Sequence, residues 1–325
     1  MLPHDGHAGQ YTTEGRPLVS VIMIFFNPGP YMDEAVSSVL QQTMKDLELV
    51  LVDDGSTDGS SEKARAWARR DSRVVLITHP GAENRGTGAS RALGGRHARG
   101  EWQAVLDSDD LWSPDHLERQ LDMATRHPEA GIVIAPVRVW VSWRGEGEDF
   151  DLPVPYETDR LLPTGALLES VTFNLRSIIP CGFMFRRSLT PPDGAADPAF
   201  RGLFEDQTMI ARLTVAAPAV AVPTVTAYYR QHPKSVVNSA PGRGARDPAT
   251  LRYLDWIEGF LATHGELTPE RSDRLAAVRA SFEPRWRFWL WYGSRWLALR
   301  VLPADARRWL RGGRMEATGR PADQS

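Results

Sequence analysis

The stretch Leu18–Phe25 is rich in β-branched and other apolar residues, with no regular alternation of polar and apolar positions. A strand with this pattern is buried on both faces, as in a parallel sheet covered by helices. Similar runs follow at Leu47–Val52, Val74–Ile77 and Trp102–Leu106, with helical spacing of apolar residues in between. This alternation predicts an α/β sheet with right-handed crossovers. The predicted helices are residues 32–42, 58–70 and 89–98.

The pattern is less regular after residue 110. Short apolar runs predict further strands, and the Glu-, Asp-, Gly- and Pro-rich stretch 144–165 is typical of a loop. A helix is expected to open at Phe204–Gln207 and to run through Leu213, and a helical pattern extends from residue 249 to about residue 311. The predicted strands are Ile132–Ala135, Val137–Val141, Phe183–Phe185 and Val220–Tyr229.

Composition excludes several classes of protein. The net charge of −3 argues against the global basic field of a nucleic-acid-binding protein. The single cysteine, Cys181, cannot form an internal disulfide, which favours a reducing compartment. No run reaches the roughly 18–20 apolar residues of a membrane span, and the polar N-terminus has no signal-peptide pattern. We therefore expect a cytoplasmic protein, either free or at the inner face of the membrane.

Acidic residues gather directly after two of the predicted strands. Asp53 and Asp54 follow the second strand, and Asp107, Asp109 and Asp110 follow the fourth. Ligands of open parallel sheets bind outside the carboxyl ends of the strands, so both groups are expected to face one crevice. Clustered carboxylates repel one another unless a cation or hydrogen-bond donors neutralise them, and a hard divalent ion does so. The alternative is that these residues only end strands and cap helices.

A series of motifs in the same order resembles the inverting family 2 glycosyltransferases. They are Val19–Asn27, Val52-Asp-Asp-Gly-Ser-Thr-Asp58, Asn84-x-Gly86, Leu106-Asp-Ser-Asp-Asp110, Gly182–Arg186, Phe204-Glu-Asp206 and Tyr229-Arg-Gln-His232. The resemblance covers roughly residues 17–240 and implies a GT-A fold, with a mostly parallel central sheet flanked by helices. It also implies a nucleotide-sugar-binding half, residues 17–110, and an acceptor-side half, residues 111–245. A flexible lead (1–16) and a helical extension (246–325) would flank them.

The resemblance assigns roles to individual positions. Phe26, where relatives more often have Tyr, and Asn27 would lie beside the nucleotide base. Asp54 would bind the base, with Asp53 and Asn84 in neighbouring motifs. Asp107 and Asp109 are the acids of the Asp-x-Asp motif and would hold the diphosphate together with the metal. Asp109 would be the metal ligand and Asp107 would also contact the ribose or sugar, with His232 near the metal or diphosphate. Asp206 would be the catalytic base, with Glu205 as the alternative. Arg85, Arg91 and Arg186 could each contact phosphate or equally be surface cations, and of the three Arg186 lies within a family-like motif. The segment Ser90-Arg91-Ala92 lacks the Asn that relatives usually carry after the Arg.

The implied reaction moves a hexose-type sugar from a nucleoside diphosphate, expected to be UDP, to an acceptor hydroxyl with inversion. Mn²⁺ or Mg²⁺ would stabilise the diphosphate leaving group, because oxygen ligands suit these ions. The acceptor stays open among a glycan, a lipid-linked sugar, a protein and a small molecule. Two other classes stay open as well: a sugar-phosphate nucleotidyltransferase and a non-catalytic sugar- or partner-binding module.

The C-terminal stretch 284–314 has its own composition. It contains five tryptophans and eight arginines, against one acid, Asp305. Trp and Arg together suit a helix on an anionic lipid surface. They equally suit packing on the catalytic domain or dimerisation, because apolar residues occur all round the helix rather than on one stripe.

Overall fold

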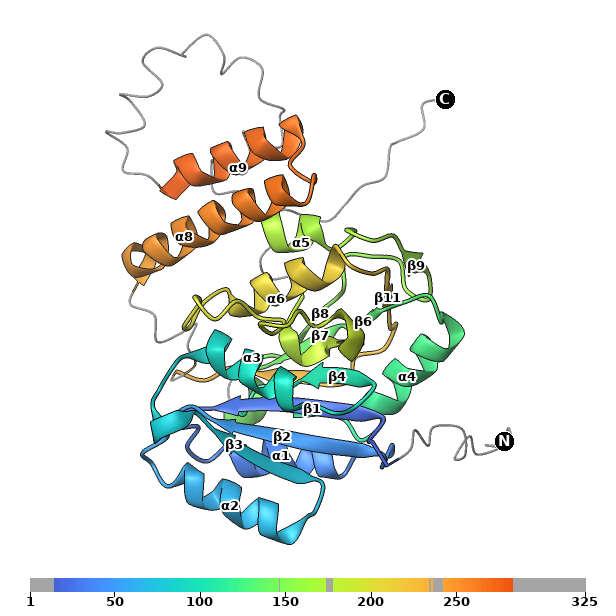
Figure 1. Ribbon diagram of the computed structural model, residues 1–325, viewed down its shortest axis with the longest axis vertical. Coiled ribbons are helices and arrows are strands. Elements are labelled where there is room, and N and C mark those ends of the chain that lie inside the picture. The colour runs from blue at the N-terminus through green and yellow to red at the C-terminus, as the bar shows by residue number, and fades with distance from the viewer. Residues whose placement is uncertain (1–14, 146, 174–177, 234, 236–241, 283–325) are drawn as a thin grey trace. The chain divides into compact units, whose positions relative to one another are not determined.

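The apolar run near the N-terminus forms strand β1 (Val19–Phe25), and all seven of its residues are buried. It pairs in parallel with β2 (Leu47–Asp53) on one side and with β4 (Trp102–Val105) on the other. Strand β3 (Val74–Thr78) continues the sheet in parallel beyond β2. The four predicted strands therefore exist within one or two residues of their expected bounds, and Figure 1 shows them together.

The computed structural model describes residues 15–145, 147–173, 178–233, 235 and 242–282. The chain divides into two compact units, Met1–Tyr253 and Leu254–Ser325. The expected lead, residues 1–16, lies almost wholly outside the described residues, as does the Trp- and Arg-rich stretch 284–314.

Helices cover both faces of the parallel strands. Alternate residues of a strand point to opposite faces. On one face Val21 and Met23 pack in the same apolar cluster as residues of α1 (Met32–Leu40) and α2 (Ser60–Arg70). On the other face Ile22 packs with Leu93 of α3 (Thr87–His97). A Cβ at position 94 would lie 2.7 Å from Cγ2 of Ile22, so glycine there lets α3 approach the sheet closely.

The same sheet continues into the second half of the chain. Strand β10 (Phe183–Arg186) pairs antiparallel with β4 and with β6 (Ile132–Ile134). Then come β11 (Ala219–Ala221), parallel to β6, and β9 (Leu161–Leu162), antiparallel to β11. The two halves expected on either side of residue 110 thus share one eight-stranded sheet.

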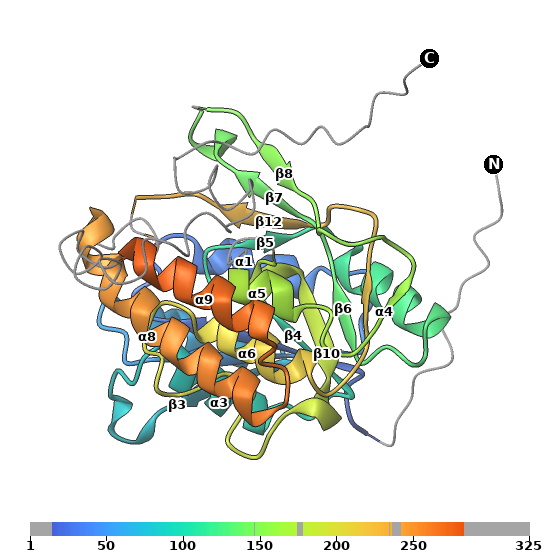
Figure 2. The ribbon, with the colours of Figure 1, turned by 90° about the horizontal axis from the view of Figure 1, so that it is seen from above.

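A smaller sheet has the order β5-β12-β7-β8, visible in Figure 2. Its strands are β5 (Leu111–Trp112), β12 (Ala227–Arg230), β7 (Val137–Trp140) and β8 (Phe150–Leu152). Strand β12 runs parallel to β7 and antiparallel to β5. This sheet connects the residues just after Asp110 to those just before His232.

Two expectations for the second half were wrong. The run Val220–Tyr229 is two strands, β11 and β12, in different sheets. Pro223 lies between them and has no N–H to continue a ladder. The stretch 144–165, expected to be a loop, contributes β8 and β9.

The remaining helices lie in the second half of the chain. Besides α1, α2 and α3, the first compact unit contains the described α-helices α4 (His116–Arg126), α5 (Leu168–Phe173) and α6 (Glu205–Thr214). Short 3₁₀ turns occur at Pro80–Ala82, Ser142–Arg144, Pro180–Gly182 and Arg187–Leu189.

The C-terminal helices match the expected helical pattern as far as the structure describes it. Helix α8 runs from Gly242 to Thr263 and α9 from Pro269 to Phe282. In the second unit, Arg279 of α9 forms ion pairs with Asp255 (2.9 Å) and Glu258 (2.8 Å) of α8. No described helix combines the length and apolar character that crossing a membrane requires.

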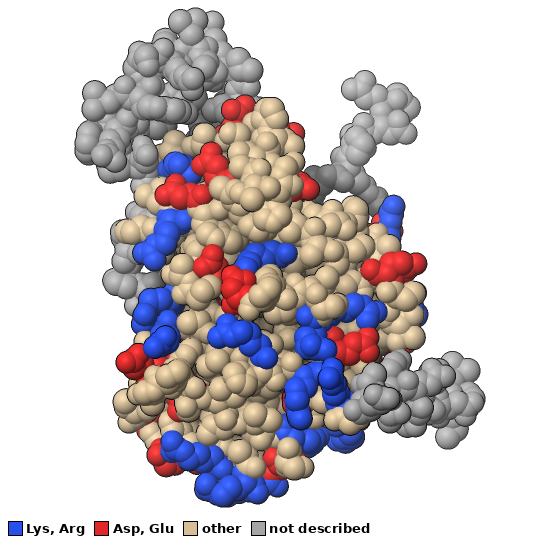
Figure 3. Space-filling view, viewed as in Figure 1, with Lys and Arg blue, Asp and Glu red and all other residues tan. Residues whose placement is uncertain are grey.

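Charges of both signs are interspersed on the face shown in Figure 3. Exposed ion pairs occur on the surface of the protein, such as Arg138 with Asp151 (2.7 Å) and Arg119 with Asp115 (2.5 Å). Exposed pairs of this kind contribute little to stability.

Candidate active site

Predicted site residues from three strands meet at one edge of the sheet. Phe26 and Asn27 follow β1, Asp53 ends β2, and Asp107 lies two residues beyond β4. Strand β1 lies between the other two and is parallel to both. The carboxyl ends of the three strands therefore open on the same side, where ligands of open α/β sheets bind.

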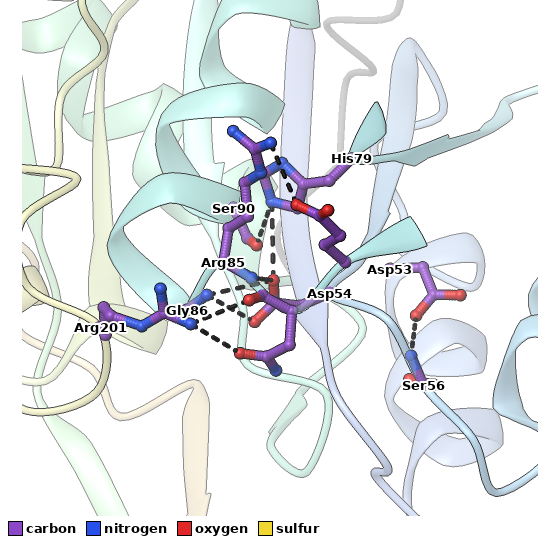
Figure 4. A network of polar contacts seen from close by, with 10 residues as sticks. Asp53, Asp54, Ser56, His79, Arg85, Gly86, Ser90 and Arg201 are labelled. Carbon is purple, nitrogen blue, oxygen red and sulfur yellow. Dashed lines mark hydrogen bonds and ion pairs between the residues drawn. The ribbon is translucent and has the colours of Figure 1, made fainter. Parts of the chain in front are cut away.

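Asp54 holds the loop that carries Asn84. Its Oδ1 accepts a hydrogen bond from the main-chain N–H of Arg85 (2.7 Å), and its Oδ2 accepts one from that of Gly86 (3.0 Å), as Figure 4 shows. The residue is only 4% exposed. The carboxylate, expected to bind the base directly, has backbone donors on both oxygens. These hydrogen bonds fix the path of residues 84–86.

The same loop is fixed from its other side. Arg201 Nη2 donates a hydrogen bond to the main-chain oxygen of Asn84 (2.9 Å). Gly86 has a φ of +87°, and a Cβ there would lie 2.7 Å from Cα of Arg201. Only glycine suits both the backbone conformation and the close approach. The Asn84-x-Gly86 motif is therefore a tight loop between Asp54 and Arg201.

Asp53 and Asn27 connect the loops after β2 and β1. Asp53 Oδ1 accepts a hydrogen bond from the N–H of Ser56 (2.8 Å), and its Oδ2 accepts one from Ser61 Oγ. Asn27 Oδ1 accepts a hydrogen bond from the N–H of Thr57 (2.7 Å). Both side chains therefore accept hydrogen bonds that stabilise these loops. Phe26, by contrast, is 52% exposed, which leaves its ring accessible to a ligand at this edge.

The acids after β4 have different neighbours. Asp107 Oδ1 pairs with Arg91 Nη2 (3.0 Å), and Asp109 Oδ2 lies 2.8 Å from His232 Nε2. Their side chains are 31% and 27% exposed. Asp110 is fully buried, and its burial, followed by the charges of Asp109 and Asp107, raises the pKa of its carboxyl well above the usual value. Negative charge is thus crowded here, with two carboxylates open to a ligand.

Arg91 joins this acidic loop to the Glu-Asp motif. Its Nη2 donates to Asp107 Oδ1 (3.0 Å) and to Glu205 Oε1 (3.1 Å). The residue is 3% exposed, and within the described chain its Nε and Nη1 have no hydrogen-bond partner. From the sequence alone, Arg91 was equally compatible with a phosphate contact and a surface cation. Its burial excludes the surface cation, because a buried charge needs partners.

Glu205 and Asp206 begin helix α6. Burial raises the pKa of Glu205 to about 8, with the charge of Asp206 as the second cause. Burial likewise raises the pKa of Asp206, which is partly exposed and accepts a hydrogen bond from the N–H of Gln207 (2.8 Å). A carboxylate with a raised pKa is a better proton acceptor at neutral pH.

The residue before this pair has a strained backbone. Phe204 has a φ of +73°, which is uncommon for a residue other than glycine. Its ring stacks on that of Tyr253, with centroids 4.8 Å apart and planes 13° from parallel. Strain of this kind persists only where the surroundings hold it, and it clusters at functional sites. The stack thus fixes the point at which Glu205 and Asp206 enter the helix.

Arg186 is the predicted site residue that the structure does not bring to this edge. It is paired with Trp102, the first residue of β4, whereas Asp107 lies beyond the other end of that strand. Five residues of extended chain correspond to about 16 Å. Its guanidinium lies over the Trp102 ring (4.4 Å) and pairs with Glu101 (2.6 Å). We therefore leave Arg186 out of the site.

The carboxylate oxygens at this site suit a hard divalent ion that is coordinated in part by the protein and in part by a substrate. Within the described residues, no three His, Cys, Asp or Glu side chains form a ready-made metal site. Asp107 and Asp109 are two partly exposed carboxylates, and magnesium-type ions commonly take one or two carboxylates plus water and phosphate oxygens. His232 contacts Asp109, the carboxylate that the resemblance assigns to the metal.

The described geometry agrees with the comparison to known proteins. Residues 20–190, more than half of the chain, match the family model described as "Glycosyl transferase family 2". The chain belongs to this family. Its GT-A fold is confirmed as well: 90% of the chain superposes on 78% of S. aureus TarS 1-349 in complex with UDP-GlcNAc, with a TM-score of 0.59 and 16% identity.

Curated members of the family align with this chain over only part of their own length. "Putative glycosyltransferase EpsH" of Bacillus subtilis is 35% identical over 141 residues, 43% of this chain and 40% of that protein. "Putative teichuronic acid biosynthesis glycosyltransferase TuaG" of the same organism is 38% identical over 110 residues, 34% of this chain and 43% of that protein. The chain thus spans less than half the length of these relatives.

Proposed function

We propose that the protein transfers a sugar from a UDP-linked donor to an acceptor hydroxyl with inversion at the anomeric carbon. The observation that carries this proposal is the convergence, in a family 2 chain, of the Asp107–Asp109 loop and the Glu205–Asp206 pair through the buried Arg91. The Asp107–Asp109 loop suits the binding of a diphosphate, and the Glu205–Asp206 pair suits the deprotonation of an attacking hydroxyl.

The nucleotide binds at the carboxyl ends of β1 and β2. The exposed ring of Phe26 stacks on the base, and Asp54 shapes the base pocket by holding residues 84–86. Asp53 and Asn27 keep the adjoining loops in place, and Asn84 lies in the loop that Asp54 holds. Aromatic side chains provide contact area with little loss of conformational freedom on binding.

The diphosphate binds beside Asp107 and Asp109. Asp107 and Asp109, with His232 next to Asp109, would hold Mn²⁺ or Mg²⁺, which when bound would supply Lewis-acid stabilisation of the leaving diphosphate. Arg91 keeps Asp107 in place and offsets its charge. The Nη2 of Arg91 contacts both Asp107 and Glu205, so Arg91 connects the diphosphate side of the site to the acceptor side.

Asp206 accepts the proton of the attacking hydroxyl. Its raised pKa favours proton transfer, and a single positioned base contributes about 10²–10⁴-fold to the rate. One displacement from the face opposite the leaving group inverts the anomeric centre. Glu205, with a pKa raised to about 8, holds a proton at neutral pH and leaves Asp206 as the ionised member of the pair.

The acceptor is a sugar hydroxyl of a growing glycan. Support comes from the similarity to TuaG, which is described as a putative teichuronic acid biosynthesis glycosyltransferase. UDP-GlcNAc is the first donor to test, since TarS, which shares the fold, was crystallised with it.

The test measures UDP release from UDP-GlcNAc and other UDP-sugars in the presence of Mn²⁺, with and without glycan acceptors. Asp206→Asn should lower transfer by about 10²–10⁴-fold and leave UDP binding nearly intact. Asp122→Asn, which changes an exposed acid of α4, is the matched control. Full transfer by Asp206→Asn would remove Asp206 from the reaction. Release of pyrophosphate from UTP and a sugar phosphate would instead indicate a nucleotidyltransferase.

A further inference from the structure

Arg230, the last residue of β12, is a buried cation at the edge of the proposed donor site. Its side chain is 3% exposed, and its Nη2 pairs with Glu34 of α1 (2.6 Å). Glu34 itself is 58% exposed, so the ion pair is open to solvent on one side only. A single partly solvated carboxylate is little compensation for burying a guanidinium, so the other contacts of Arg230 must explain its position.

Three aromatic rings surround the guanidinium. Its carbon lies 4.7 Å from the ring centre of Trp140 and 5.0 Å from those of Tyr31 and Trp143. We call these three residues the aromatic box. Tyr31 and Trp143 meet edge to face (5.5 Å), and Trp143 Nε1 donates to the main-chain oxygen of Gln231 (2.9 Å). Rings held in this way stabilise a flat cation in one orientation.

That orientation directs Arg230 at the acidic loop. Its Nε donates to the main-chain oxygen of Asp109 (2.8 Å), and its N–H donates to Asp110 Oδ1 (2.9 Å). Two residues on, His232 Nε2 lies 2.8 Å from Asp109 Oδ2. The segment 230–232 therefore contacts residues 109 and 110 at three points, two of them through Arg230.

We propose that Arg230, oriented by the aromatic box, is a positioning residue that fixes the main chain of Asp109 and Asp110 so that the carboxylate of Asp109 faces the donor's diphosphate. The inference rests on the proposed donor site. A lysine keeps the charge but has no Nε–H beside a separate terminal nitrogen, and it cannot lie flat between the rings. Replacing Arg230 by lysine therefore removes the geometry of its contacts while keeping its positive charge.

The experiment compares Arg230→Lys with Arg186→Lys. Arg186 is the matched control because it also combines an ion pair with a Trp ring contact, at the far end of β4. Binding of UDP with Mn²⁺ is measured by calorimetry, the thermal midpoint reports stability, and UDP release from UDP-GlcNAc gives KM and kcat. Arg230→Met, which removes the charge as well, is the companion variant, and Arg230→Lys keeps the test usable if that variant does not fold.

Arg230→Lys should weaken UDP binding by about ten-fold or more, the usual effect of losing a charge-assisted hydrogen bond. Its KM for the donor should rise by more than its kcat falls, since a purely structural defect lowers the active fraction instead. Arg186→Lys should bind UDP like the wild type. Glu34→Gln, which leaves the contacts to Asp109 and Asp110 in place, should change UDP affinity by about two-fold or less.

Unchanged UDP affinity in Arg230→Lys would overturn the inference, even if Arg230→Met bound weakly, because charge alone would then suffice. Equal losses in Arg230→Lys and Arg186→Lys would overturn it too, as a general effect of stability. If the wild type and Arg230→Lys bind UDP equally well, the proposed donor site is supported, but the positioning role of Arg230 is contradicted. If the wild type binds no UDP, the donor site fails and the inference falls with it.

Discussion

Two acidic clusters at the same edge of the sheet differ in what neutralises their carboxylates. In the β2 cluster, Asp53 and Asp54, main-chain N–H groups and a serine hydroxyl donate to the carboxylate oxygens. In the β4 cluster, the partly exposed Asp107 and Asp109 contact the side chains of Arg91 and His232, and the buried Asp110 accepts a hydrogen bond from the main-chain N–H of Arg230.

The difference separates a structural use of acids from a functional one. Carboxylates that accept backbone hydrogen bonds hold loops and are buried, as Asp54 is at 4% exposure. In the β4 cluster, burial and then the charges of Asp109 and Asp107 raise the pKa of Asp110, and crowded negative charge of this kind gains from an added cation. The partly exposed Asp107 and Asp109 are therefore the ones expected to bind a ligand, although both clusters follow strands in the same way.

The largest effect is expected from Asp109→Asn in the β4 cluster. If Asp109 binds the metal as proposed, losing its carboxylate should lower UDP-sugar turnover on the order of 10²-fold or more, because Lewis-acid stabilisation is worth several kcal/mol. The free energy of unfolding should stay close to that of the wild type, since the side chain is partly exposed. Turnover in the presence of Mn²⁺ and urea unfolding check the two statements. Wild-type turnover in this variant would contradict the assignment of ligand binding to the β4 cluster.

Asp54→Asn in the β2 cluster should act mainly on stability. One amide NH₂ would face the main-chain N–H groups of residues 85 and 86, which should lower the free energy of unfolding by about 1–3 kcal/mol. Urea unfolding measures this loss, with the exposed Asp122→Asn as the control. A variant as stable as the wild type, but unable to bind UDP, would show that Asp54 serves the ligand and not the loop.

Glu205→Gln should change how stability depends on pH. The pKa of Glu205 is raised from its ordinary 4.5 to about 8, so the folded protein keeps a proton that the unfolded chain releases across this range. The free energy of unfolding of the wild type should therefore fall, relative to the variant, as pH rises from about 4.5 to 8. Unfolding curves of both proteins at several pH values test this. A difference that stays constant or grows with pH would contradict the raised pKa.

The smallest effect is expected from Arg186→Met, far from both clusters. Losing its pair with Glu101 and its contact with Trp102 should cost about 1 kcal/mol of unfolding free energy. UDP affinity, measured by calorimetry, should not change. Weakened UDP binding would return Arg186 to the donor site that the family resemblance suggested.

Patterns within short segments predicted much of the fold. The unbroken apolar runs mark β1 to β4 because a strand buried on both faces needs apolar residues at every position. The later strands were harder to predict, since three or four residues carry too little periodicity to separate a strand from a bend. Pro223 was visible in the run Val220–Tyr229, yet its division into two sheets depends on partners elsewhere in the chain.

The sequence by itself determined where the acids fall, at the ends of β2 and β4 and at the start of α6. Local patterns suffice for that, because strand and helix periods span only a few residues. Only the tertiary structure decided that Asp54 holds a loop, that Arg186 lies at the other end of β4, and that Arg91 and Arg230 contact the acidic loop. Arg230 is 121 residues from Asp109, and such contacts depend on how whole elements pack.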